Sequence, residues 1–272
     1  MQLLVNFGIP VLLVLMGGSA GGRYGQQFLG SVLGLIIALI YLSFIKRADL
    51  LMMKGSKAIK SGNTDAGIAL YEKAINTKGL STDYLIYAPF IFLRYGYEDK
   101  CLNALNKAEK LRALTPGQKK NLLITKGLYL WKTGEGEDAE KAFYDAHNMG
   151  IDSQTYSYIG FILMENKKYD EAYEFNKEAM EYNEDDASIM DNMALSYYHK
   201  GEIAEALSLY DKIMEKGTHF PVIYYNHALC LITAGDIGKA KEQLNKALSF
   251  KISHIAAVSG EEIEAKLKEL GE

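Results

Sequence analysis

The sequence predicts an all-α protein in which about six helix–turn–helix repeats follow an apolar amino-terminal region. Three observations lead to this fold class: a spacing of small and large residues that recurs along the chain, glycine turns within the copies, and two long uncharged runs before the first copy. The 272 residues are 49% hydrophobic and have a net charge of −4, which fits one anchored array of repeats with a mildly acidic surface.

The first 47 residues are predicted to be a membrane anchor with apolar segments at about 2–20 and 26–45. Residues 28–45 are all apolar or small, close to the ~20 residues that a helix needs to cross a bilayer. The first segment is shorter and contains Pro10, so it either crosses the membrane too or is a cleaved signal peptide, although the basic start of such a peptide is missing. One or two transmembrane helices are therefore expected.

Basic residues follow the second segment, whereas only Arg23 lies between the two segments. The juxtamembrane basic residues are Lys46, Arg47, Lys54 and Lys57. Because basic residues accumulate on the cytoplasmic side, the repeats are expected to be cytoplasmic. The same side chains would contact anionic lipid, or they form an ordinary solvated helix face.

Small residues recur at four-residue steps in the second segment, at Gly30, Gly34 and Ala38. Such a face lets membrane helices pack closely, in a hairpin or a homo-oligomer, although glycine is common in membrane helices in any case. No helix breaker lies between Leu35 and Gly55, so the second segment is expected to continue directly into the first repeat helix.

The repeats are recognised by one small residue in the middle of each copy. These residues recur at steps of 34, 38, 33, 34 and 34, namely Gly67, Cys101, Ala139, Ala172, Ala206 and Ala240. Twelve positions earlier lies a second set, Gly55, Pro89, Gly127, Gly160, Ala194 and Ala228. Large apolar residues return three and four positions later, which is helical spacing. Each copy therefore predicts two helices that approach closely, with a turn at residues such as Gly134, Gly201 or Gly235.

This pattern resembles the tetratricopeptide repeat (TPR) family, whose signature places small and aromatic residues at these offsets within 34 residues. The resemblance covers about residues 48–250 and implies an α-solenoid. Departures are Pro89 within a helix, Asn176 in place of an aromatic residue, and four extra residues near "ALTPGQ". Residues 251–272 are expected to form a capping helix, with Ser259 and Glu262 in capping-box spacing.

The sequence contains no pattern that indicates catalysis, a metal or a cofactor, so we predict a protein that is not an enzyme and needs no cofactor. Cys101 and Cys230 lie at inward repeat positions and are expected to be small core residues rather than a disulfide. The five histidines show no metal-ligand spacing. Basic clusters interleaved with aromatic residues are missing from the acidic repeats, so nucleic acid is not an expected partner.

The TPR resemblance implies a concave groove lined by the first helix of each repeat. Its predicted lining is Trp131, Tyr158, Phe161, Asn192, Leu195, Tyr198, Tyr225, Asn226 and Leu229. An apolar and aromatic lining is typical of partner sites, although the same side chains could pack between repeats. Asn192 and Asn226 occupy equivalent positions, where amides hold a ligand's main chain in peptide-binding members of the family; the alternative is that the repeat tolerates asparagine there.

The leading hypothesis is a membrane-anchored TPR adaptor that binds a protein or peptide in this groove on the cytoplasmic side. The alternative is a structural protein that assembles copies of itself in the membrane. The chain resembles membrane-anchored bacterial TPR proteins, so an integral protein of the bacterial inner membrane is expected.

Overall fold

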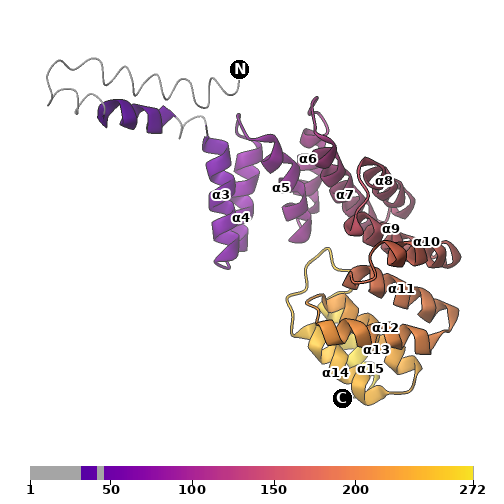
Figure 1. Ribbon diagram of the computed structural model, residues 1–272. Coiled ribbons are helices and arrows are strands. Elements are labelled where there is room, and N and C mark those ends of the chain that lie inside the picture. Colours follow the sequence, from indigo (N-terminus) through magenta and orange to yellow (C-terminus); the bar gives the residue numbers. More distant parts are fainter. Residues whose placement is uncertain (1–31, 42–45, 272) are drawn as a thin grey trace. The chain divides into compact units, whose positions relative to one another are not determined.

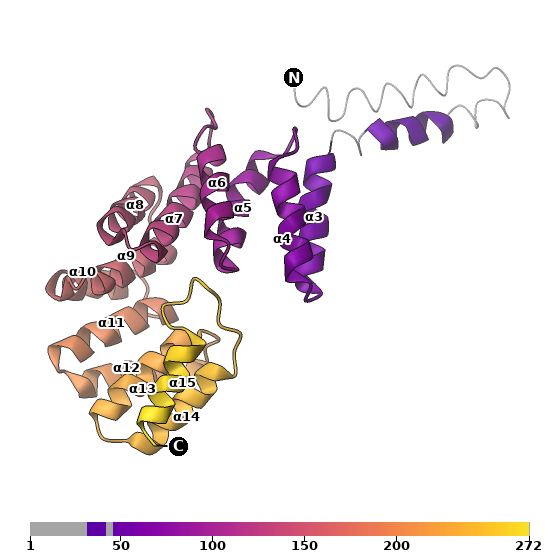
Figure 2. The ribbon, with the colours of Figure 1, turned by 180° about the vertical axis from the view of Figure 1, so that it is seen from behind.

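The protein is all-helical wherever the computed structural model describes it, at residues 32–41 and 46–271 (Figures 1 and 2). The chain divides into two compact units, Met1–Ala88 and Pro89–Glu272. Beyond the helix at 32–41, the elements are α3 (Arg47–Lys60), α4 (Thr64–Ile75), α5 (Thr82–Arg94), α6 (Glu98–Ala108), α7 (Pro116–Lys132), α8 (Gly136–Met149), α9 (Ser153–Glu165), α10 (Tyr169–Tyr182), α11 (Ala187–Lys200), α12 (Ile203–Lys216), α13 (Pro221–Thr233), α14 (Ile237–Leu248) and α15 (Gly260–Glu269). The prediction of six helix pairs and a final helix is confirmed.

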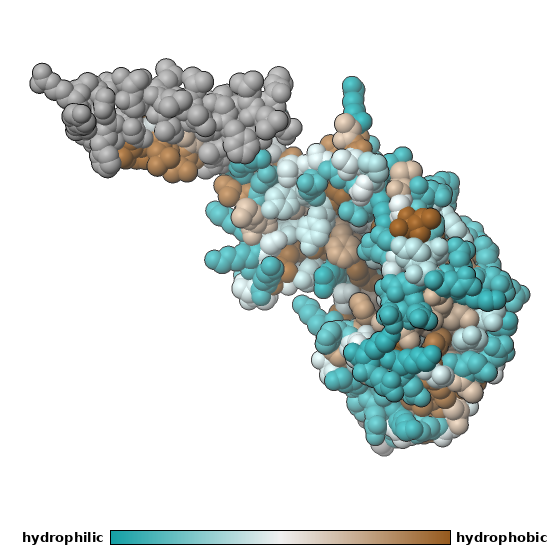
Figure 3. All heavy atoms as spheres, in the orientation of Figure 1, coloured by the Kyte–Doolittle hydropathy of each residue, from teal (hydrophilic) through white to brown (hydrophobic). Residues whose placement is uncertain are grey.

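The helix at residues 32–41 presents an apolar surface to solvent. Its large aliphatic side chains are exposed, up to 63% for Ile40, whereas Gly34 and Ala38 are buried. Hydrophobic atoms accordingly gather on this helix in Figure 3. The predicted membrane segments lie mostly outside the described residues, as do Gly30 and the junction at 42–45. Within residues 32–41 and 46–271, no helix combines the length and apolar character needed to span a bilayer.

In the first unit, α3 packs against α4 at a point where both helices carry glycine. A Cβ atom at Gly55 would lie 2.5 Å from the Tyr71 ring, and one at Gly67 would lie 2.8 Å from the Gly55 carbonyl oxygen. The Tyr71 hydroxyl forms a 2.7 Å hydrogen bond with Ser56 Oγ. Small residues therefore allow the close approach that the repeat spacing predicts.

In the second unit, the helices after α5 follow the same antiparallel plan. α7 packs against α8 and α13 against α14, while α11 contacts the first helices on both sides of it, α9 and α13. The predicted turns at Gly134, Gly201 and Gly235 are confirmed, with φ of 87°, 81° and 84°. The equivalent turn of the fourth repeat places Lys167 at φ 60°. Pro89 lies inside α5 without ending it.

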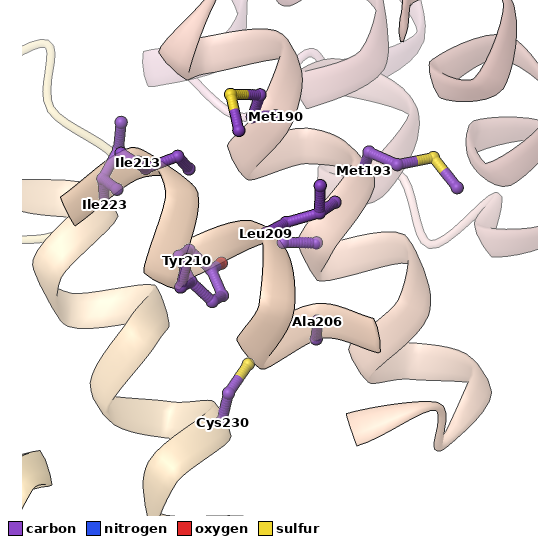
Figure 4. Close-up of a cluster of buried hydrophobic side chains, with 9 residues drawn as sticks. Met190, Met193, Ala206, Leu209, Tyr210, Ile213, Ile223 and Cys230 are labelled. Atoms are coloured by element: carbon purple, nitrogen blue, oxygen red, sulfur yellow. The ribbon is translucent and has the colours of Figure 1, made fainter. Parts of the chain in front are cut away.

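One cluster of buried hydrophobic side chains in the second unit joins α11, α12 and α13 (Figure 4). Around α12, the fully buried Tyr210 and Ile213 pack with Met190, Ile223 and Cys230. Cys101 and Cys230 are both buried free thiols, and burial raises the pKa of each to about 12. The sequence-based assignment of both cysteines to the core is confirmed.

The last helix, α15, is the predicted capping helix. Ser259 Oγ accepts the Glu262 amide N–H at 3.1 Å, and the Glu262 carboxylate accepts the Ser259 amide N–H at 2.7 Å. Ile263 and Leu267 are buried against α13 and α14. Both halves of the predicted capping box are therefore formed.

Candidate functional site

The candidate site is the row of side chains that the first helices of repeats three to six carry, which we call the first-helix face. Its apolar members are Trp131 on α7, Phe161 on α9, Leu195 and Tyr198 on α11, and Tyr225 and Leu229 on α13. All six are half-buried, neither enclosed in the core nor freely exposed. The face can therefore offer apolar surface to a ligand only through parts of these side chains.

Neighbouring first helices are tied together along this face. Trp131 meets Phe161 edge to face with ring centroids 4.8 Å apart. Its indole N–H donates to Glu165 Oε2 at 3.0 Å, and Lys132 Nζ lies 4.2 Å from the centroid of the same indole. Thr233 Oγ1 donates to the Tyr198 hydroxyl at 3.4 Å. These contacts hold Trp131, Phe161 and Tyr198 in place without a ligand.

The two asparagines at equivalent positions are buried, and their amide nitrogens are bonded within the protein. Asn192 Nδ2 donates to the Ser157 carbonyl oxygen at 2.8 Å. Asn226 Nδ2 donates to both carboxylate oxygens of Asp191, at 3.2 and 3.1 Å. Each amide nitrogen thus joins one first helix to the preceding one, so both asparagines contribute to the packing between first helices.

Tyr158 on α9 is half-buried. Its ring stacks on the buried Phe143 ring with centroids 5.1 Å apart and an interplanar angle of 7°. Desolvation raises the pKa of the Tyr158 hydroxyl. In the next repeat the equivalent of Phe143 is Asn176, whose side chain is fully buried.

Asp191 is a buried acid beneath the face, and sequence analysis did not single out its charge. Its carboxylate accepts a 2.9 Å hydrogen bond from the Tyr210 hydroxyl in addition to those from Asn226. Desolvation raises the pKa of Asp191 to about 6, although both hydrogen bonds act to lower it. The signal was present in the sequence, because an acid directly before a repeat asparagine on a core helix must find polar partners.

Tyr210, which binds this acid, also stacks on His227, with ring centroids 5.0 Å apart. His227 is 5% exposed, and its Nδ1 atom has no hydrogen-bond partner among the described residues. Burial lowers the pKa of the imidazole to about 4. The fifth and sixth repeats are therefore joined through a buried polar layer.

A second feature that sequence analysis missed is the connection between α14 and α15, residues 250–258. It contacts the ends of α5 and α7, more than a hundred positions earlier in the chain. Its sequence, "FKISHIAAV", has no periodicity or turn motif that would place it there. Such a long-range contact has no local sequence signal.

Two tetratricopeptide repeat family models match the chain, at residues 187–217 and 221–251. These ranges cover the fifth and sixth helix pairs. Among curated proteins, none matches this sequence.

Several solved structures share the fold. A tetratricopeptide repeat protein from Parabacteroides merdae ATCC 43184 is 15% identical with a TM-score of 0.69, over 97% of this chain and 100% of that one. The Pseudomonas aeruginosa protein pilF is 18% identical with a TM-score of 0.55, over 82% and 99%. A thermophilic TPR protein in Thermus thermophilus is 20% identical with a TM-score of 0.52, over 68% and 99%. At these identities the likeness concerns the fold.

The family matches, the six helix pairs and the shared fold agree with one another. The protein is a member of the tetratricopeptide repeat family.

Proposed function

We propose that the protein is a membrane-anchored TPR adaptor that binds an apolar or aromatic segment of a partner protein along its first-helix face. TPR proteins typically mediate protein–protein interactions, and the TPR fold is typically a non-enzymatic scaffold. The observation that carries the proposal is the row of half-buried aromatic and apolar side chains on four successive first helices. Partly exposed aromatic side chains on rigid helices are the usual anchors of protein interfaces.

The chemistry of the face favours an apolar ligand segment. Trp131, Phe161 and Tyr198 offer ring surface, and ring surface binds apolar and aromatic side chains with little loss of conformational entropy. The buried amides of Asn192 and Asn226 serve the packing between helices, so ligand contacts are assigned to the rings and to Leu195 and Leu229. The partner is a protein or peptide, and neither nucleic acid nor a cofactor is part of the proposal.

Membrane anchoring is supported by the exposed helix at 32–41 and by the helix that follows it in the chain. An exposed apolar helix needs a lipid or protein environment to cover it. Arg47, Lys54 and Lys57 are exposed on α3 beside the exposed Leu50 and Met53. Basic and apolar side chains on one helix fit the surface of an anionic membrane. We assign Gly34 and Ala38 to helix packing in the membrane, and the repeats to the cytoplasmic side of a bacterial inner membrane.

Site-specific photo-crosslinking in cell membranes tests the proposal. One crosslinking residue replaces Tyr198 on the first-helix face, and a control replaces Tyr182, which is 49% exposed on α10. The proposal expects a partner segment that crosslinks at position 198 and not at 182. A synthetic peptide of that segment should then bind the purified wild-type protein, and binding should fall at least tenfold in Leu195→Glu/Leu229→Glu.

Two results would contradict the adaptor proposal. Equal crosslinking at both positions would mean that the first-helix face has no special role. Crosslinks between copies of this chain alone would favour self-assembly, for which the exposed apolar helix at 32–41 would be the natural contact. Circular dichroism of the double variant checks that its repeats remain folded.

A further inference from the structure

Residues 250–258 form a strap that returns from the last repeat to the second and third repeats. The His254 amide N–H donates to the Arg94 carbonyl oxygen at 3.2 Å. His254 Nε2 lies 2.9 Å from Glu98 Oε1 at the start of α6. Lys132 Nζ, at the end of α7, donates to the Ala256 carbonyl oxygen at 2.9 Å. Figures 1 and 2 show the strap as the gold loop that rises from the α14 and α15 region.

The tip of the strap is a compact turn. The Ala256 amide N–H donates to the Ser253 carbonyl oxygen at 2.9 Å, so the chain reverses between these residues. His254 fits over Gly96, whose Cβ position would lie 3.5 Å from His254 Nδ1. A hollow of about 230 Å³ lies between the turn and the end of α5, lined by Arg94, Tyr95 and residues 251–254. The strap thus meets the second repeat through a small, fitted contact.

The strap reaches the first-helix face through Lys132. The same Nζ atom that binds the Ala256 carbonyl lies over the Trp131 ring, and the indole N–H of Trp131 is bonded to Glu165. Desolvation lowers the pKa of Lys132, while the carboxylates of Glu165, Glu262 and Glu98 act to raise it. One lysine therefore connects the strap, the third repeat and the first aromatic residue of the proposed binding face.

The tip of the strap is held on the second and third repeats by polar contacts, whereas its ends pack against the last repeat through Phe250, Ile252 and Val258. Val258 is its only fully buried apolar residue, whereas Lys251, His254 and Ala257 are exposed. By contrast, the following helix α15 buries Ile263 and Leu267 against the last repeat. Because exposed hydrogen bonds and ion pairs contribute little each, the tip of the strap can detach from these two repeats while its ends and α15 stay in place.

We propose that the strap is an intramolecular latch, which closes the Trp131 end of the first-helix face until a partner displaces it. The inference rests on the proposed function for its biological meaning, but the latch itself can be observed without any partner. The segment that closes the face is residues 250–258 of this chain, and it is held by Lys132, the Arg94 carbonyl oxygen and Glu98. Release frees the Lys132 ammonium and opens one side of Trp131.

Hydrogen exchange measured by mass spectrometry on the full chain tests whether Lys132 holds the strap. In Lys132→Met, the strap amides, above all that of His254, should exchange about tenfold faster than in wild type, as expected from the loss of one hydrogen bond to a charged donor. The matched control is Lys126→Met on the same helix, whose Nζ pairs with Glu109 at 2.7 Å instead. Equal strap exchange in Lys132→Met and wild type would overturn the latch.

Tryptophan fluorescence provides a second readout, because Trp131 is the only tryptophan. A full-chain variant with residues 251–257 replaced by glycine and serine should show stronger acrylamide quenching of Trp131. A synthetic peptide of residues 250–258, added in trans, should reverse that change, and a scrambled peptide should not. Unchanged quenching in the variant, with its repeats folded by circular dichroism, would overturn the latch. If hydrogen exchange and tryptophan quenching both give the results expected for the latch but no partner crosslinks at position 198, the adaptor proposal is rejected and the latch is retained.

Discussion

The third and fourth repeats build the same three-residue layer from different chemistry. In the third repeat the layer is Gly127, Phe143 and Tyr158, and a Cβ at Gly127 would lie 2.5 Å from the Phe143 ring. In the fourth repeat the equivalent residues are Gly160, Asn176 and Asn192. Stacked rings in one layer are thus replaced by amides in the next.

The nitrogen of the central amide is hydrogen-bonded to the following first helix. Asn176 Nδ2 donates to the Asn192 carbonyl oxygen at 3.2 Å and to Ser196 Oγ at 3.0 Å. Its Oδ1 atom is buried with no hydrogen-bond partner among the described residues. The comparison teaches that the repeat frame requires a close fit at this position, which either an aromatic ring or a hydrogen-bonded amide can provide. The two solutions should differ in their contribution to stability.

The largest expected effect is on the aromatic layer. Phe143→Ala removes a fully buried ring that two neighbours contact, so the free energy of unfolding should fall by about 3–5 kcal/mol. Asn176→Ala removes two hydrogen bonds but a smaller volume, and should cost about 1–3 kcal/mol. Urea unfolding followed by circular dichroism measures both. Phe220→Ala, at a 54% exposed position, is the control. Equal losses at positions 143 and 176 would show that the two layers are energetically equivalent.

Gly160→Ala tests how tightly the amide layer fits. The added Cβ would lie 1.9 Å from Asn176 Oδ1 and 2.8 Å from Asn192 Nδ2, so both buried amides must move, at a cost of about 1–3 kcal/mol. Gly117→Ala is the control, since no atom lies within 4 Å of that Cβ. The double variant Gly160→Ala/Asn176→Ala should lose about 1 kcal/mol less unfolding free energy than the sum of the two single losses. Strict additivity would mean that Asn176 is not the obstacle.

The corresponding layer around Tyr210 contains two titratable groups, Asp191 and His227, so its contribution to stability should depend on pH. The pKa of Asp191 is about 6 in the folded protein and 3.8 in the unfolded chain. The stabilisation that this difference provides is therefore complete below pH 3.8 and is lost as the pH rises through 6. The pKa of His227 is about 4 against 6.5 unfolded, so its contribution is full above 6.5 and is lost as pH falls toward 4. Between pH 7 and pH 5 the two groups oppose each other.

Replacing the histidine should separate the two effects. In His227→Phe, which keeps the ring stacked on Tyr210, stability should rise by about 1 kcal/mol between pH 7 and pH 5, through protonation of Asp191. In His227→Phe/Asp191→Asn this rise should disappear. Urea unfolding at a series of pH values measures the difference between the two variants, which cancels titration elsewhere in the chain. The same pH slope in both would show that Asp191 does not titrate in this range.

The helices, the turns and the period could be predicted from the sequence because each depends on residues within one repeat. The glycine at each turn and the small residues at Gly127 and Gly160 are local requirements that the spacing displays directly. The capping box at Ser259 is equally local. These elements follow from helix geometry and steric fit alone.

The chemistry between repeats could not be predicted in the same way. Sequence analysis identified Asn176 as a departure from the TPR pattern. Its partners Asn192 and Ser196 belong to the next repeat, and they are set by how α10 packs against α11. The strap is a stronger case, since Lys132 and Ala256 are 124 positions apart. The groove residues were found by their repeat positions, whereas the use of Asn192 and Asn226 as ties between helices required the structure.

The smallest expected effect concerns the turns of the same two repeats. Gly134 and Lys167 occupy equivalent turn positions with positive φ, and only lysine is strained by that conformation. Lys167→Gly should therefore raise the free energy of unfolding by about 1 kcal/mol, and Gly134→Lys should lower it by a similar amount. No atom lies within 4 Å of a Cβ at Gly134, so the change reports backbone strain alone. If urea unfolding shows no gain for Lys167→Gly, the fourth repeat differs from the third through its amide layer and not through its turn.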